Sequence, residues 1–154
     1  MRRRRPEKRV ILPDTKYNDL SVAKFINYIM ESGKKGVAEK IFYSAMELVH
    51  KKTKTDGIKI FKKGIENTSP SVEVKSRRIG GATYQVPIEV PKKRAFYLAS
   101  LWIINASKNS SGKPMSEKLA SELIAAANGD GNAIKKKEDT HRMADANKAF
   151  AHFR

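Results

Sequence analysis

The side chains that could do chemistry in this sequence are mostly cationic, and their chemistry is the binding of anions. Lysine and arginine together number 32, against 16 aspartates and glutamates, so the formal net charge is +16. Such a surplus repels itself in the folded state and attracts polyanions. Surface solubility explains a modest excess of bases but not twice as many bases as acids, so nucleic acid is the predicted partner.

Residue patterns typical of catalysis or metal binding are missing. The histidines His50, His141 and His152 share no metal-ligand spacing with each other or with carboxylates. The sequence has no nucleophile elbow and no P-loop pattern. Cysteine is absent, which excludes disulfides and thiolate metal sites and is typical of a reducing compartment. We therefore expect neither an enzyme nor a bound cofactor or metal.

Membrane and secretory signals are also missing. No apolar run reaches the length of a membrane span, and no apolar stretch follows the N-terminal arginines as in a secretory signal. No basic helix has the aromatic apolar face of a membrane-surface binder. We expect a cytoplasmic protein without a membrane partner.

The most distinctive element that could position the cations is the stretch from Val72 to Val90. Its residues alternate with period two around Gly80 and Gly81, which predicts a β-hairpin. A lone hairpin is marginal in water, so it should lean on the helices at its base or on a partner. Three basic residues lie towards its tip: Lys75, Arg77 and Arg78.

Two registers of this hairpin are possible. A two-residue loop would set Glu73 against Ile88, whereas a three-residue loop would set Val74 against Ile88. We prefer the three-residue loop because it separates an apolar face from a polar one. It places Glu73 opposite Glu89, a like-charge pair.

Hydrophobic periodicity and capping residues predict six helices in the rest of the chain, a mainly α fold with the hairpin between the third and fourth. The helices are expected after Asp19 or Ser21 up to Gly33, after Gly36 up to Lys54, after Asp56 up to Pro70, from Pro91 to Ala106, from Met115 to Ala127, and after Gly131. Lys34 and Lys35 should lie in the loop before the second helix.

The fourth helix should be central, because its apolar arc is too wide for a surface helix. Trp102 is then more consistent with the core than with base stacking. Lys92, Lys93 and Arg94 crowd its first turn, where the helix dipole disfavours cations. A phosphate bound at that helix start would offset this penalty.

Both ends of the chain are rich in basic residues and poor in apolar ones. No linker divides the chain into domains. Residues 1–10 form an arm with four consecutive arginines, which we expect to lie along phosphates. The sixth helix has a poor hydrophobic period, so it should pack weakly and present a cationic side. Residues 148–154 are expected to form an extended tail of the single domain 1–154.

Basic residues at the ends of several elements suit a folded RNA better than one DNA groove, because RNA is recognised by shape and backbone at separated points. The alternative is an architectural DNA-binding protein with basic β-arms. It would need a symmetric dimer and apolar wedges at the tip, for which Ile79 is the one candidate.

Four segments resemble the family of bacterial-type small-subunit ribosomal protein seven. They are VEVKSRRIGGATYQVPIEV at 72–90 with the helix of Trp102 after it, KKKEDTHRMADANKAFAHFR at 135–154, LPDTKYND from Leu12, and FINYIMESGKKG from Phe25. The resemblance covers nearly the whole chain.

The resemblance implies a primary binder of the 3′ major domain of small-subunit ribosomal RNA that starts assembly of the subunit head. Its hairpin would lie near the exit-site transfer RNA and the messenger RNA path, and it would contact neighbouring ribosomal proteins. The ribosome would be cytoplasmic or organellar. The RNA-binding residues carried over to this chain are Arg2, Arg3, Arg4, Arg5, Lys8, Arg9, Lys34, Lys35, Lys75, Arg77, Arg78, Lys92, Lys93, Arg94, Lys113, Lys136 and Arg142.

Overall fold

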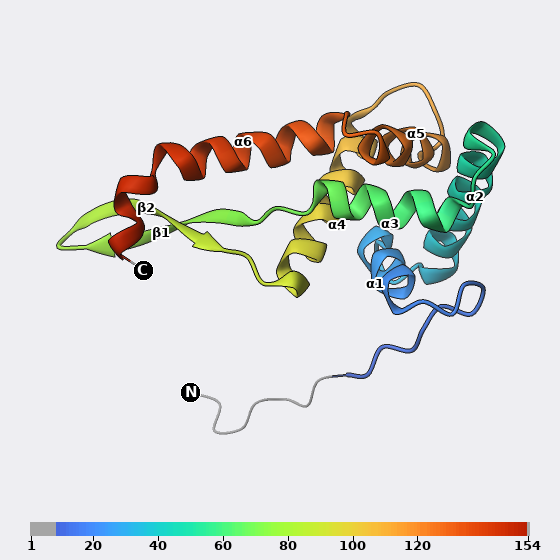
Figure 1. Ribbon diagram of the computed structural model, residues 1–154. Coiled ribbons are helices and arrows are strands. Elements are labelled where there is room, and N and C mark those ends of the chain that lie inside the picture. Colours follow the sequence, from blue (N-terminus) through green and yellow to red (C-terminus); the bar gives the residue numbers. More distant parts are fainter. Residues whose placement is uncertain (1–8, 154) are drawn as a thin grey trace. The chain divides into compact units, whose positions relative to one another are not determined.

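Six α-helices and one two-stranded antiparallel hairpin make up the computed structural model over the residues that it describes, 9–153 (Figure 1). The hairpin lies between the third and fourth helices, as predicted. The elements are α1 Leu20–Ile29, α2 Lys35–Thr53, α3 Gly57–Thr68, β1 Val72–Ile79, β2 Ala82–Glu89, α4 Lys92–Asn109, α5 Met115–Ala127, α6 Asn132–Ala146 and the 3₁₀ helix η1 Lys148–Phe153.

Aspartate side chains start two of the helices. The Asp19 carboxylate accepts a hydrogen bond from the Ser21 amide at 2.7 Å, which decides between the two predicted caps of α1. The Asp56 carboxylate accepts from the Ile58 amide at 3.1 Å and caps α3, as predicted. Such caps satisfy amides that the first helical turn leaves without an intrahelical partner.

The chain has two compact units, residues 1–39 and 40–154. In the first unit, α1 buries the predicted stripe, including Val22, Phe25 and Ile26. Helix α2 begins in this unit at Lys35, so the prediction of a loop at Lys35 is wrong.

In the second unit, α4 is the central helix and contacts α3, α5 and α6. Its buried arc includes Ala95, Ala99 and Ile103. Trp102 lies beside that arc with intermediate burial, so it is less enclosed than a core position predicts. The core includes an edge-to-face pair of Phe42 and Phe61, with ring centroids 5.5 Å apart.

The paired strands adopt the two-residue loop, so our preferred register is wrong. Glu73 lies opposite Ile88, and Glu89 lies opposite Val72 rather than Glu73. Gly80 and Gly81 have φ values of +56° and +90°, and positive φ at both central residues is what a type I′ turn requires. The geometry of the Gly80-Gly81 turn outweighed the separation of polar and apolar faces.

The C-terminal elements pack on the hairpin (Figure 1). Helix α6 contacts α4 and β1, and the small buried residues Ala133 and Ala144 allow close packing, contrary to the weak packing predicted. The tail is not extended: η1 contacts β2, and the Phe150 ring lies 5.3 Å from that of Tyr84. This aromatic contact explains why the tail folds back on the strand.

Candidate nucleic-acid interface

All the predicted RNA-binding side chains that the structure describes are solvent-exposed. They come from the segment before α1, the start of α2, the hairpin, the start of α4, the loop before α5, and α6. They are Arg9, Lys34, Lys35, Lys75, Arg77, Arg78, Lys92, Lys93, Arg94, Lys113, Lys136 and Arg142. Arg2, Arg3, Arg4, Arg5 and Lys8 lie outside the described residues.

Most of these cations are not neutralised by carboxylates of the described chain. Two form exposed ion pairs with helical neighbours: Lys35 with Glu39 at 3.9 Å and Arg142 with Asp139 at 3.8 Å. Exposed pairs of this kind contribute little energy, so a phosphate competes with them readily. Lys75 and Arg94 pair with Glu73. No ion pair within residues 9–153 involves Arg9, Lys34, Arg77, Arg78, Lys92, Lys93, Lys113 or Lys136.

The register distributes the hairpin cations over both of its faces. Residues directly opposite each other in an antiparallel pair point to the same face, and successive residues alternate. Arg77 therefore shares a face with its partner Tyr84, and Arg78 shares the other face with Thr83. The hairpin tip can contact anions from two sides.

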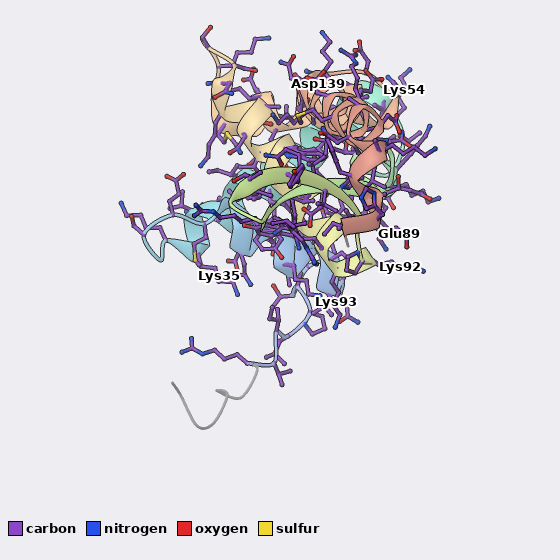
Figure 2. All side chains as sticks on the ribbon, turned by 90° about the vertical axis from the view of Figure 1, so that its left-hand side faces the viewer. Lys35, Lys54, Glu89, Lys92, Lys93 and Asp139 are labelled. Atoms are coloured by element: carbon purple, nitrogen blue, oxygen red, sulfur yellow. The ribbon has the colours of Figure 1, made fainter. Side chains whose placement is uncertain are left out.

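The start of α4 combines exposed cations with unsatisfied helix amides. Lys92 and Lys93 are neighbours there in Figure 2 and form no ion pair within the described chain. Pro91 precedes the helix without a side-chain cap, and the first turn contains no acidic residue. An anion at this point would meet amides, a favourable dipole and two ammonium groups.

Helix α6 contains two adjacent lysines in different environments. Lys136 is exposed, whereas Lys137 is half-buried and donates from Nζ to the backbone oxygen of Asn67 at 2.6 Å. That oxygen belongs to the last turn of α3, and the Ser69 amide after the helix bonds the carbonyls of Ile65 and Glu66 instead. Lys137 is therefore a structural residue, although the cationic side predicted for this helix included it.

The histidines serve backbone contacts rather than chemistry. His141 Nε2 accepts from the Ser71 amide at 3.2 Å and links α6 to the start of β1. His50 Nδ1 lies 2.8 Å from the Thr55 oxygen, in the turn between α2 and α3. Residues 9–153 contain no group of three potential metal ligands. No helix in the same range is long and apolar enough to cross a membrane.

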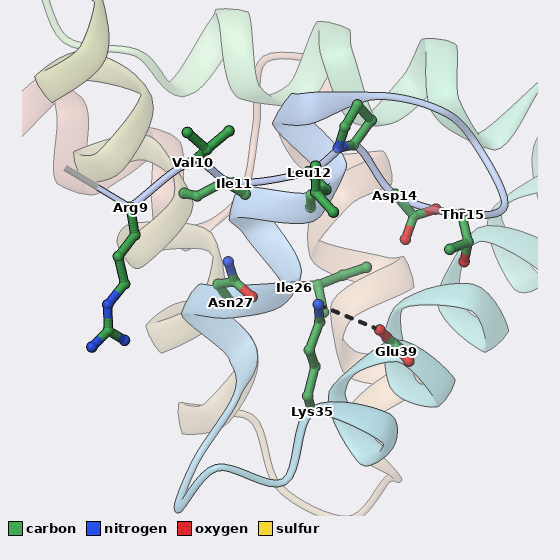
Figure 3. A pocket seen from close by; sticks show the side chains of 12 residues that line it. Arg9, Val10, Ile11, Leu12, Asp14, Thr15, Ile26, Asn27, Lys35 and Glu39 are labelled. Atoms are coloured by element: carbon green, nitrogen blue, oxygen red, sulfur yellow. Dashed lines mark ion pairs between the residues drawn. The ribbon is translucent and has the colours of Figure 1, made fainter. Parts of the chain in front are cut away.

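A pocket of about 460 Å³ lies between the segment 9–15, α1 and the start of α2, all in the first unit (Figure 3). Val10, Ile11 and Leu12 contribute apolar side chains to its lining. Its charged groups are Arg9, Asp14 and the Lys35–Glu39 pair, and its lining contains neither histidine nor serine. This lining supplies no catalytic arrangement.

Sequence reasoning missed exposed cations on α3. Lys59 and Lys63 are exposed there, four residues apart on one side of the helix. Their position opposite the buried Phe61 and Ile65 could have revealed them, because an amphipathic helix shows its polar residues away from the apolar stripe. They extend the positive surface of the second unit.

Comparison with known proteins identifies the family of this chain. The family model described as "Ribosomal protein S7p/S5e" matches residues 1–148. The small ribosomal subunit protein uS7 of Thermotoga maritima is 56% identical over 154 residues, which are 100% of this chain and 99% of that protein. The protein of the same name from an Anaeromyxobacter species is 59% identical over 153 residues, 99% of this chain and 98% of that protein. This chain therefore belongs to the ribosomal protein S7 family.

Proposed function

We propose that this chain is a structural component of the small ribosomal subunit. In this role it binds the 3′ major domain of the ribosomal RNA as a primary binder and nucleates assembly of the subunit head. The observation that carries the proposal is the set of exposed, unneutralised cations on separate elements. Relatives that match nearly the whole chain are small ribosomal subunit proteins.

The mechanism is passive and needs no catalytic group. Buried apolar faces make each unit a preformed support, so its cations have defined spacing before RNA arrives. RNA phosphates then replace the small counterions around these side chains, and release of the counterions drives binding. Contacts made with the backbone at separated points recognise the shape of the RNA more than its sequence.

The hairpin is the element that we assign to the exit-site transfer RNA and the messenger RNA path. Arg78 and the tip are our choice for this contact, because Arg78 is exposed and forms no ion pair within the described chain. Neighbouring small-subunit proteins complete the set of proposed partners. The site is the cytoplasmic ribosome, or its organellar counterpart.

Competition between nucleic acids tests this proposal. The full chain is bound to a labelled fragment of the 3′ major domain, and unlabelled random RNA of equal length or duplex DNA is added. We expect only the unlabelled fragment to displace the label efficiently, and we expect the chain to cosediment with small subunits. Equal displacement by random RNA would contradict the proposal.

The same assay distinguishes the ribosomal role from the alternative, an architectural DNA-binding protein. That alternative needs apolar wedges at the tip, and Ile79 is 39% exposed there, next to the glycine turn. Preferential displacement by duplex DNA, together with a dimer in solution, would favour the alternative. Family membership and a single wedge candidate favour the ribosomal role.

A further inference from the structure

A carboxylate is buried at the base of the hairpin, among residues otherwise assigned to RNA. Glu73 of β1 is 8% exposed, while Lys75, Arg77 and Arg78 of the same strand are exposed. A glutamate is rarely this buried unless cations or hydrogen-bond donors compensate for its desolvation. The cations that contact Glu73 should therefore account for its burial.

The two oxygens of Glu73 bind two different cations. Arg94 places Nε and Nη2 each 3.3 Å from Oε2, and Lys75 places Nζ 3.5 Å from Oε1. The Arg94 guanidinium also lies 5.3 Å from the centroid of the Tyr97 ring. Arg94 is thus held by a strand residue and by an aromatic residue of its own helix.

Both cations remain accessible in this arrangement. The side chains of Lys75 and Arg94 are 58% and 45% exposed, against 11% for Glu73. An ammonium and a guanidinium each have more N–H donors than Glu73 uses, so donors remain for an external anion. A fixed guanidinium also loses less rotamer entropy when it binds a phosphate.

We propose that Glu73 is a positioning residue for RNA binding. It orients Lys75 and Arg94 towards phosphates, and it holds the base of the hairpin against the first turn of α4. The inference rests on the proposed function, since it assigns a role within the same RNA-binding surface. The carboxylate of Glu73 itself is repelled by the phosphates of RNA, so its contribution to binding would be indirect.

The sign of a mutational effect distinguishes positioning from bulk charge. If Glu73 acted only through its charge, Glu73→Gln would strengthen RNA binding, because a negative charge is removed from the surface. If Glu73 positions its two partners, the same substitution weakens binding. Glu73→Asp keeps the charge but shortens the reach to Arg94, so it should also weaken binding.

The experiment measures the affinity of the full-length variants for the 3′ major domain fragment over a series of salt concentrations. Glu89→Gln is the matched control, because it removes an exposed carboxylate from the other strand of the hairpin. We expect Glu89→Gln to bind at least as tightly as the unmodified chain. We expect Glu73→Gln and Glu73→Asp to bind about tenfold more weakly, as when one charge-assisted hydrogen bond to RNA is removed.

The salt dependence adds a second readout. For every phosphate that the variant no longer binds, the slope of log affinity against log salt should become shallower by about 0.7–0.9, which removal of a negative charge alone would not produce. Circular dichroism below each melting temperature checks that the helices are intact. Glu73 variants that bind as tightly as the unmodified chain would overturn the inference. Failure of the unmodified chain to prefer the fragment would instead contradict the proposed function.

Discussion

Neighbouring cations of identical type differ in role because their local partners differ. Lys136 points into solvent, whereas Lys137 reaches the end of α3 and binds the Asn67 carbonyl. Asn67 in turn donates from Nδ2 to the carbonyls of Ala126 and Ala127, each at 3.0 Å, at the end of α5. A count of lysines in α6 therefore overestimates the charge that it can offer to RNA.

Methionine substitutions separate these two roles. Lys137→Met should lower the free energy of unfolding by about 1.5–3 kcal/mol, because a charge-assisted hydrogen bond is removed and a carbonyl is left without a partner. Lys136→Met should leave it within about 0.5 kcal/mol. Denaturant unfolding measures both values. RNA affinity should fall for Lys136→Met. Equal stabilities of the two variants would contradict the assignment.

Helices α3, α5 and α6 satisfy one another's ends. Glu122 of α5 accepts a hydrogen bond from the Ala133 amide at 2.8 Å, at the start of α6. This contact supplies a cap that the preceding Gly131 has no side chain to provide. The carboxylate also offsets the lack of any acidic residue in the first turn of α6. The three helices thus form one hydrogen-bonded body.

The approach of α2 to α3 depends on a glycine. A Cβ on Gly57 would lie 2.8 Å from the Met46 carbonyl oxygen, whereas a Cβ on Gly36 would meet nothing within 4 Å. Gly57→Ala should destabilise the protein by about 1–3 kcal/mol, because the backbones must separate. Gly36→Ala should stabilise it by roughly 0.5 kcal/mol, since alanine is the better helix former. Thermal melting would show shifts of opposite sign, and a stabilising Gly57→Ala would refute the close contact.

The folded tail restrains the hairpin through η1. Replacing Phe150 with alanine removes the ring that lies on Tyr84, a contact worth about 0.5–1.5 kcal/mol for an aromatic pair. We expect amide hydrogens of β2 to exchange faster in Phe150→Ala, while amides of α4 keep their protection. Lys148→Ala is the control, because Lys148 is exposed in the same element. Unchanged exchange in β2 would show that the tail does not restrain the strand.

The whole molecule carries far more positive charge than its own acids neutralise. With a net charge of +16, repulsion between like charges opposes the folded state. Salt screens this repulsion, since the Debye length falls from about 30 Å at 0.01 M to about 10 Å at 0.1 M. The same salt weakens the attraction to phosphates.

Stability and RNA affinity should therefore respond to salt in opposite directions. We expect the melting temperature of the free protein to rise between low and moderate concentrations of potassium chloride. Over the same range, its affinity for the ribosomal RNA fragment should fall steeply. Calorimetry and binding titrations in matched buffers measure the two responses. A melting temperature that falls with salt would mean that internal ion pairs outweigh the repulsion.

Helix positions were predictable from the sequence because the forces that set them are local. The caps Asp19 and Asp56 act within two residues, and α5 occupies the range Met115–Ala127 that was predicted. The cationic character and the six-helix plan with one hairpin also followed from residue types and periodicity. These signals lie within a few positions of one another along the chain.

The tertiary structure alone decided the burial of Glu73, the structural role of Lys137 and the folded tail. The reason is that each depends on partners distant in sequence. Lys137 bonds a carbonyl 70 positions away, and Arg94 reaches Glu73 across 21 positions. The composition and the hydrophobic periodicity of the sequence carry no information about such partners. Burial of a charge, in particular, depends on which opposite charges the fold brings within bonding distance.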